Sequence, residues 1–455
     1  MSLEAINPST GEIIATYDEM TPEEVELIIN QLQGAFFHWR RTGFAERANL
    51  LNKAAEVLRK YSDKYARVMT DEMGKPIKDA RSEVEKCAWV CEYYAENGER
   101  FLQPETIETD ATKSFVAFQP LGVVLAVMPW NYPFWQVFRF AAAGLMAGNT
   151  VLLKHAVNVP GCALAIEEIF RKAEFPEHVF RAPLAGSDKV GRIIESPLVR
   201  AVTLTGSVRA GRAVAEKAGT MLKKTVLELG GSDPYLILED ADLETAVETC
   251  VFSRLLNSGQ SCIAAKRFVV VASQREQFEK LFTQRMAEAK MGDPTAEHTE
   301  VGPQARLDLR EDLHRQVIQS IKRGAKLLLG GQVPEGKGSF YPPTVLTNVR
   351  KGMPAFDEEL FGPVGAIVPV KDEEEAVQVA NETSFGLGAA VFTKDVARGE
   401  RIAAEKLEAG CCFVNDFVRS DPRLPFGGVK ESGYGRELSH YGIKEFVNIK
   451  TVVVK

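Results

Sequence analysis

The sequence lacks several features that would assign it to a common class of protein. None of its apolar stretches is long enough to span a bilayer, the longest being residues 121–130, and its first residues include neither a basic nor an apolar segment. Lysine and arginine are spread along the 455 residues, and the formal net charge is -7. These absences argue against a membrane or nucleic-acid partner, and we expect a cytoplasmic protein.

Cysteine is also scarce, since the chain has 7 of them, and none shows the paired spacing of a zinc site. We therefore expect no bound metal. Cys87 and Cys91 are four residues apart in a helical pattern and can share a face, whereas Cys411 and Cys412 are adjacent in a strand pattern. For these four, and for Cys162 and Cys250, we expect small buried hydrophobic residues.

The usual phosphate-binding motifs are missing as well. Residues 205–211, TGSVRAG, contain neither the dinucleotide motif G-x-G-x-x-G nor the lysine and hydroxyl of a P-loop. A strand that ends at Gly206 and Ser207 before a helix nevertheless presents backbone N–H groups that favour an anion. On its own, this is a weak signal for a nucleotide.

The sequence does contain a regular alternation of strands and helices. After a strand pair near the N-terminus and a helical stretch over 21–100, apolar strands alternate with helices of ten or more residues, which is typical of parallel βαβ units. We expect strands at 114–130, 149–155, 201–206, 234–238, 266–272, 365–370 and 388–393. The length predicts two domains, with a boundary in the glycine-rich turn at 227–234.

The last ten residues, FVNIKTVVVK, form a β-branched strand with no partner following in sequence. Such a strand has unpaired backbone groups unless another strand covers it. It should therefore pair within the chain or add to the sheet of another subunit.

Three residues have side chains suited to acyl chemistry. Cys262 lies in NSGQSCIAAKR, a loop whose small residues would let a substrate reach the thiol. Glu228, between two leucines in LELGG, would become more basic on burial and could act as a general base. Asn131, in MPWNYP, offers a rigid N–H donor for an oxyanion. Each also has a structural alternative: a buried cysteine, a strand-end ion pair and a helix cap, respectively.

Seven motifs follow one another in an order that resembles the aldehyde dehydrogenase superfamily over the whole chain. They are PWNYP, LLKHA, TGSVRAG, LELGGSDP, GQSC, EELFGPV and PFGGVKESGYGRE. The resemblance implies an α/β fold with a variant Rossmann cofactor domain that lacks the glycine motif, an α/β catalytic domain and a small β element for oligomerisation. These would span 1–112 with 129–229, 230–437, and 113–128 with 438–455. The implied assembly is a homodimer or homotetramer.

The resemblance also implies roles for the matching residues. Cys262 would be the nucleophile, Asn131 and the Cys262 backbone N–H the oxyanion hole, and Glu228 the base for the water that hydrolyses the thioester. Lys154 and Glu359 would hold the cofactor riboses, Phe361 would pack on the nicotinamide ribose, Ser207 would contact the pyrophosphate and Trp130 would line the cleft. Gly206 and Val157 complete the expected cofactor-binding set.

Two departures from the family pattern bear on the choice between NADP and NAD. His155 stands where a proline usually follows the lysine, and Val157 occupies a position that often carries a glutamate for the adenosine ribose. Without that carboxylate a 2′-phosphate is not repelled, and Lys154 can attract it. We therefore slightly favour NADP over NAD.

Arg139 suggests the substrate. It follows Asn131 by two helical turns and matches a carboxylate-binding arginine of the bacterial succinate-semialdehyde dehydrogenases, which the chain resembles. A second arginine of that group is not matched, because Leu256 stands there; Arg254 or Arg419 could substitute, with Ser420 adding a hydroxyl. The alternative is that Arg139 pairs with an acidic neighbour at the domain interface.

The sequence also leaves three other functions open: a cysteine hydrolase, a CoA-acylating dehydrogenase and a redox-sensing protein. A cysteine hydrolase would need a histidine near the thiol, and none of the 6 histidines lies in a motif with it. A CoA-acylating dehydrogenase would share the oxidation, but Glu228 favours water as the acceptor. A redox-sensing relative would not need Asn131, Glu228 and Cys262 together. Another small or neutral aldehyde remains an alternative substrate.

Overall fold

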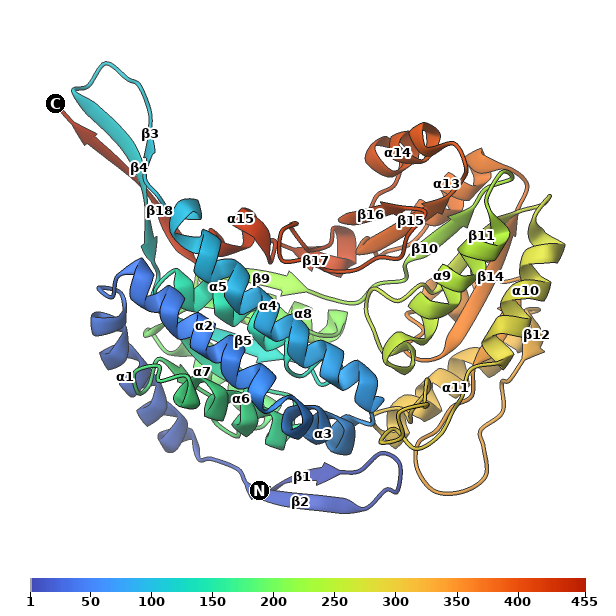
Figure 1. Cartoon of the computed structure of the whole chain (residues 1–455), viewed down its shortest axis with the longest axis horizontal. Helices are drawn as coiled ribbons and strands as arrows, with labels where there is room; N and C mark the ends of the chain where they lie inside the picture. Colours follow the sequence, from blue (N-terminus) through green and yellow to red (C-terminus); the bar gives the residue numbers. More distant parts are fainter. Residues whose placement is uncertain (1) are drawn as a thin grey trace.

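Segments rich in valine, isoleucine and leucine form two largely parallel sheets in the computed structural model, which describes residues 2–455 (Figure 1). The first sheet has six strands, in the order β17 (Gly433–Tyr434), β9 (Lys224–Glu228), β8 (Val199–Thr205), β5 (Val123–Met128), β6 (Thr150–His155) and β7 (Phe180–Arg181). All of its neighbours are parallel except the short pair of β17 with β9.

Helices accompany this sheet and form the left part of the molecule in Figure 1. They are α1 (Pro22–Trp39), α2 (Phe44–Lys60), α3 (Ser62–Met73), α4 (Ile77–Phe101), α5 (Trp135–Met146), α6 (Pro160–Lys172), α7 (Val190–Glu195) and α8 (Val208–Thr220). The start of α1 follows from local sequence: the Thr21 hydroxyl accepts from the Glu24 N–H, and the Glu24 carboxylate accepts from the Thr21 N–H. A hairpin of β1 (Ser2–Ile6) and β2 (Ile13–Asp18) precedes it.

The second sheet has seven strands and forms the right part of Figure 1. Their order is β12 (Lys326–Leu329), β13 (Thr344–Thr347), β14 (Val364–Val370), β11 (Arg267–Val271), β10 (Pro234–Ile237), β15 (Gly388–Phe392) and β16 (Cys411–Val414), with β12 antiparallel. The accompanying helices are α9 (Leu243–Leu255), α10 (Arg275–Ala287), α11 (Leu307–Lys322), α12 (Pro354–Asp357), α13 (Glu373–Asn381) and α14 (Val396–Glu405). The two predicted α/β units are therefore present.

The C-terminal strand pairs within the chain. β18 (Val447–Val454) runs antiparallel to β4 (Lys113–Pro120), which also pairs with β3 (Glu105–Thr106), and this arm projects from the body in Figure 1. The short helix α15 (Ser439–Ile443) leads into it. The stretch 113–128 does not stay together as expected: β4 joins the arm, whereas β5 lies inside the six-stranded sheet. The turn between them at Gly122, whose φ is 140°, separates the two strands.

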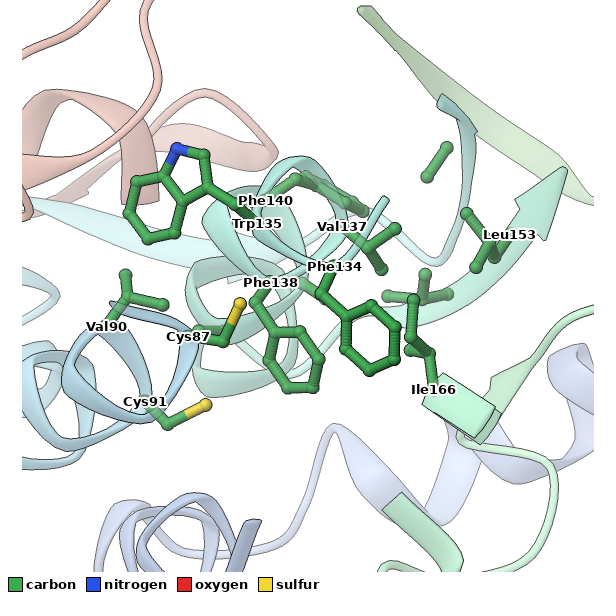
Figure 2. Packing of buried hydrophobic residues seen from close by; sticks show 14 of the residues in the cluster. Cys87, Val90, Cys91, Phe134, Trp135, Val137, Phe138, Phe140, Leu153 and Ile166 are labelled. Atoms are coloured by element: carbon green, nitrogen blue, oxygen red, sulfur yellow. The ribbon is translucent and has the colours of Figure 1, made fainter. Parts of the chain in front are cut away.

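The core between α4 and α5 contains the cysteines expected to act as hydrophobic residues. Cys87 and Cys91 are fully buried, and Figure 2 shows them beside Phe138. In the same view the indole of Trp135 points away from the rings of Phe134 and Phe138. Cys411 and Cys412, in contrast, are only partly buried. Across residues 2–455, no helix is long and apolar enough to cross a membrane.

Candidate active site

Predicted cofactor residues and the predicted base Glu228 gather at the carboxyl ends of adjacent parallel strands. Lys154 is the penultimate residue of β6, Trp130 follows β5, Gly206 and Ser207 follow β8, and Glu228 ends β9. These four strands are neighbours in the order β9-β8-β5-β6. Open α/β sheets bind ligands at this edge, so the sheet brings together residues that are far apart in the sequence.

The Cys262 thiol lies in a loop between α9 and β11, and the loop has an unusual backbone. Asn257, Ser258 and Gly259 have φ of 56°, 56° and 74°, so three consecutive residues adopt the left-handed region. A Cβ on Gly259 would lie 2.4 Å from the backbone of Gly362, so this position requires glycine. The loop is thus fitted closely against the segment that carries Glu359 and Phe361.

Lys266 holds the same loop from inside. Its ammonium donates to the carbonyls of Ser261 at 2.9 Å, Cys262 at 2.7 Å and Ala264 at 3.4 Å, and its side chain is buried. Its Nζ also lies 3.6 Å from Oε1 of Glu359. This lysine links the nucleophile loop to a predicted cofactor residue, and its place could not be recognised without the tertiary structure.

Cys262 is partly buried. Burial raises the pKa of Cys262 to about 12, with Lys266 and Arg139 acting in the opposite direction. The resting state is therefore a neutral thiol, which needs a base or a nearby positive charge to react. His155 does not serve as that base: its Nδ1 accepts from the Ala156 N–H, its Nε2 faces the Pro133 carbonyl at 2.8 Å, and burial lowers its pKa to about 4.

Asn131 is buried next to the nucleophile loop. Its Nδ2 donates to the carbonyl of Gln260 at 3.1 Å, and its Oδ1 accepts from Gln136 Nε2 at 3.2 Å. These two bonds fix the orientation of the amide and use one of its two N–H groups. The second N–H can therefore donate to a ligand. No bond caps α5 through the Asn131 side chain.

Glu228 is buried, and in the described part of the chain neither of its carboxylate oxygens has a hydrogen-bond partner. Burial raises its pKa well above the usual value for a glutamate, opposed by the charge of Arg139. Gly427 makes room for it, since a Cβ there would lie 2.7 Å from Glu228 Oε1. An unpaired, strongly basic carboxylate is what a general base needs.

Glu359 and Phe361 lie on the segment packed against the nucleophile loop, and Trp130 contacts Phe361. Glu359 Oε1 accepts from the Gly231 N–H at 3.0 Å, and a Cβ on Gly230 would lie 2.5 Å from Oε2. The rings of Trp130 and Phe361 meet edge to face, with centroids 5.7 Å apart. The structure thus places these three residues together, as a shared cofactor site requires.

Lys154, Val157 and Ser207 lie farther along the strand ends. The Lys154 ammonium donates to Ser187 Oγ at 3.1 Å, and burial lowers its pKa to about 8. Val157 is 39% exposed, and Ser207 caps α8 by accepting from the Ala210 N–H. The first turn of α8 has no acidic residue, so its N–H groups remain suited to a diphosphate. This set of donors fits a dinucleotide.

A cavity of about 480 Å³ reaches Cys262 from the side of α4 and α5. Its wall includes Arg139, Arg419 and Ser420 from the predicted substrate set, but not Arg254. Arg254 is fully buried and donates to the Gly259 carbonyl at 2.6 Å, so it supports the nucleophile loop. This geometry therefore does not favour a contact between Arg254 and the substrate.

Arg139 is already paired. Its guanidinium forms a buried ion pair with Glu437 and donates to Thr205 Oγ1 at 3.1 Å. Arg139 thus pairs with an acidic residue, which was the alternative to binding a substrate carboxylate. It also lines the cavity. Glu437 belongs to the GYGRE motif, but its partner could not be identified from the sequence because the two lie in distant segments.

Arg419 and Ser420 follow β16 in a loop over the cavity. Arg419 pairs with Asp416 at 2.5 Å, and Ser420 Oγ accepts from Lys86 Nζ at 2.8 Å. Lys86, on α4, also lines the cavity, although no feature of the sequence singles it out. No motif surrounds it, so only the packing of α4 on α5 reveals its position.

Comparison with known proteins agrees with this geometry. The sequence profile described as "Aldehyde dehydrogenase family" matches residues 1–452. A probable succinate-semialdehyde dehydrogenase [NADP(+)] of Synechocystis sp. is 49% identical over 452 residues, which cover 99% of each chain. The succinate semialdehyde dehydrogenase [NAD(P)+] Sad of Escherichia coli is 47% identical, with 98% of this chain and 97% of that protein covered.

Solved structures agree as well. The succinic semialdehyde dehydrogenase from Streptococcus pyogenes, in complex with NADP+, superposes with a TM-score of 0.97 at 38% identity and covers 99% of both chains. The predicted fold class, with its variant Rossmann and catalytic units, is confirmed by this likeness. The resemblance to the aldehyde dehydrogenase superfamily, which rested on the ordered motifs, is confirmed as well. The chain belongs to the aldehyde dehydrogenase family.

Proposed function

We propose that the protein oxidises succinate semialdehyde to succinate with NADP+ or NAD+. The observation that carries this proposal is the cavity at Cys262, whose wall combines the thiol with the cationic side chains of Lys86, Arg139 and Arg419. The two carboxylates of the wall already have partners within the chain: Asp79 accepts from the Asn257 N–H, and Glu83 pairs with Lys75. Such a wall suits an aldehyde whose far end is an anion. The names of the relatives in Synechocystis and E. coli support the same substrate.

The chemistry follows from three side chains. After the proton of the Cys262 thiol has passed to a water molecule, the sulfur adds to the aldehyde carbon and forms a thiohemiacetal whose oxyanion accepts from the Asn131 amide and the Cys262 N–H. Bound nicotinamide dinucleotide supplies the acceptor for the hydride that leaves this carbon. The resulting thioester is attacked by a water whose proton passes to Glu228, which releases the carboxylic acid and regenerates the thiol.

We propose that the cofactor lies along the strand ends, with its diphosphate at Ser207 and Gly206 and its riboses at Lys154 and Glu359. NADP+ is favoured slightly, because Val157 offers no carboxylate to repel a 2′-phosphate and Lys154 is cationic. The solved NADP+ complex of the Streptococcus pyogenes enzyme and the names of the relatives support this preference. Trp130 and Phe361 would enclose the nicotinamide side.

The substrate proposal is tested with succinate semialdehyde and butanal, which has the same carbon chain without the carboxylate. Formation of reduced nicotinamide is followed by its absorbance for both aldehydes and both cofactors. We expect kcat/KM to favour succinate semialdehyde by more than about tenfold, since a charge-assisted hydrogen bond is worth more than about 1.4 kcal/mol. A smaller preference would remove the proposed substrate, and hydrolysis of an ester without oxidation of any aldehyde would favour a hydrolase.

We also propose that the chain forms a homodimer or homotetramer through its β arm. β18 is an edge strand that pairs only with β4 in residues 2–455, and its Ile449 and Val453 side chains are more than half exposed. An edge of this kind is normally covered. Light scattering after size-exclusion chromatography gives the mass, and a monomer would contradict the proposal.

A further inference from the structure

We propose that Lys86 binds the carboxylate of the aldehyde substrate and thereby supplies the second cation that the sequence lacks at Leu256. This inference deepens the proposed function and rests on it. It concerns a residue on α4, a helix that contributes none of the residues expected to act in catalysis or cofactor binding.

The geometry leaves the Lys86 ammonium available. Its Nζ donates to Ser420 Oγ at 2.8 Å and lies 4.3 Å from the centre of the Trp135 ring. Within residues 2–455, no carboxylate lies within 4.0 Å of it. An ammonium has three N–H donors, so two remain for a ligand in the cavity.

The arginines near this cavity are occupied to a greater degree, and Lys78, which also borders it, has no hydrogen-bond partner in residues 2–455 that fixes its ammonium. Arg139 is neutralised by Glu437, Arg419 pairs with Asp416, and Arg254 is turned to the Gly259 carbonyl outside the cavity. Among the cations that line the cavity, Lys86 is therefore the one whose position is fixed by a hydrogen bond and whose charge has no counter-ion. A cation without a counter-ion in a partly desolvated place favours an anion that can reach it.

The surroundings of Lys86 strengthen such a contact. Trp135, Phe252 and Phe426 line the same cavity and limit access of water to the charge. Burial and the charge of Arg139 lower the pKa of Lys86 to about 8, while Asp421 and Glu83 act in the opposite direction. The ammonium is still mostly protonated at neutral pH, and a bound carboxylate would remove part of the cost of keeping it charged.

Ser420 has a defined part in this arrangement. It is buried, and its hydroxyl accepts one Lys86 N–H, which fixes where the ammonium points. The sequence suggested Ser420 as a direct contact to the substrate. We infer that it acts at least as a positioning residue for Lys86.

The test compares Lys86→Met with Lys78→Met in the full-length protein. Lys78 is on the same helix and borders both this cavity and a neighbouring one formed with Glu248 and Arg285, so its removal changes the charge equally. The measured quantity is the ratio of kcat/KM for succinate semialdehyde to that for butanal. We expect Lys86→Met to lower this ratio about ten- to a hundredfold, mainly through KM of the semialdehyde, and Lys78→Met to change it less than about threefold.

Two further variants sharpen the result. Lys86→Arg keeps the charge and should recover part of the ratio, and Ser420→Ala should lower it less than Lys86→Met does. Butanal oxidation by each variant shows whether the protein is folded and binds cofactor.

The outcomes separate the two proposals. A wild-type preference for the semialdehyde that survives Lys86→Met overturns the role of Lys86 and leaves the proposed substrate standing. An equal loss in Lys78→Met would also overturn it, because the effect would then be one of general charge. If the wild-type protein shows no preference, the proposed substrate fails and the role of Lys86 fails with it.

Discussion

The nucleophile loop and the cofactor strand ends lie next to each other but are built differently. Around Cys262 the backbone is held by buried side chains: Lys266 donates to three carbonyls, and Asn257 and Gln260 are fully buried. At the strand ends, Val157 and Ser207 are exposed, whereas Lys154 is buried.

The difference follows from what each region must do. A nucleophile must keep its geometry through the whole reaction, so its contacts are made in advance by the protein. A cofactor must enter and leave, so its donors are left with room for a ligand. Changes to the loop should therefore reduce turnover and stability, whereas changes to the strand ends should alter the choice of cofactor.

The largest effect is expected for Asn131→Ala. Loss of one oxyanion donor should lower kcat about 10²- to 10³-fold with little change in KM for the cofactor. Steady-state kinetics with both cofactors measures this, and the midpoint of thermal unfolding serves as the control for folding. A loss of cofactor binding with unchanged kcat would assign Asn131 to the cofactor site and not to the nucleophile loop.

The fold was predictable because parallel strands are buried on both faces and therefore appear as continuous apolar runs, as in VVLAVM of β5. The division of residues 113–128 between the arm and the six-stranded sheet was not predictable. This β-rich stretch contains two strands, and only the turn at Gly122 separates them. The ordered motifs pointed to residues that lie together at the strand ends and in the nucleophile loop. Lys86, Lys266 and the Glu437 partner of Arg139 depend on packing between distant segments, which no local pattern records.

Lys266→Met tests whether the loop is held in advance. It leaves the carbonyls of Ser261 and Cys262 without their buried donor, and we expect the free energy of unfolding to fall by about 1–3 kcal/mol, with a lower kcat. Urea denaturation measures this. Lys64→Met is the control, because the exposed pair of Lys64 with Glu168 should be worth less than about 1 kcal/mol. Equal losses in both variants would contradict the special role of Lys266.

Val157→Glu tests the strand ends. A carboxylate there should repel the 2′-phosphate and shift the ratio of kcat/KM for NADP+ over NAD+ about fivefold towards NAD+, since a close pair of charges in water is worth about 1 kcal/mol. Stability should stay the same because the side chain is exposed. Val157→Gln is the neutral control. A strong wild-type preference for NAD+ that Val157→Glu barely changes would overturn this account of cofactor choice.

The smallest effect is expected from pH. Burial lowers the pKa of Lys154 to about 8, so the ammonium is charged below this pH and neutral above it. As pH rises from about 7 to about 9, the preference for NADP+ over NAD+ should fall a few-fold, because only the 2′-phosphate gains from the charge. Taking the ratio of the two cofactors cancels the titration of Cys262. A ratio independent of pH would mean that Lys154 does not face the phosphate.

The central claim is that Cys262 carries the acyl group and that Glu228 releases it. The most direct measurement is mass spectrometry of Glu228→Gln after mixing with aldehyde and cofactor. We predict one acyl group per active site, mapped to the peptide that contains Cys262, together with an equal amount of reduced nicotinamide and little further turnover. The same adduct should be absent from Cys262→Ser. Continued turnover by Cys262→Ser, or an acyl group on another residue, would contradict the mechanism.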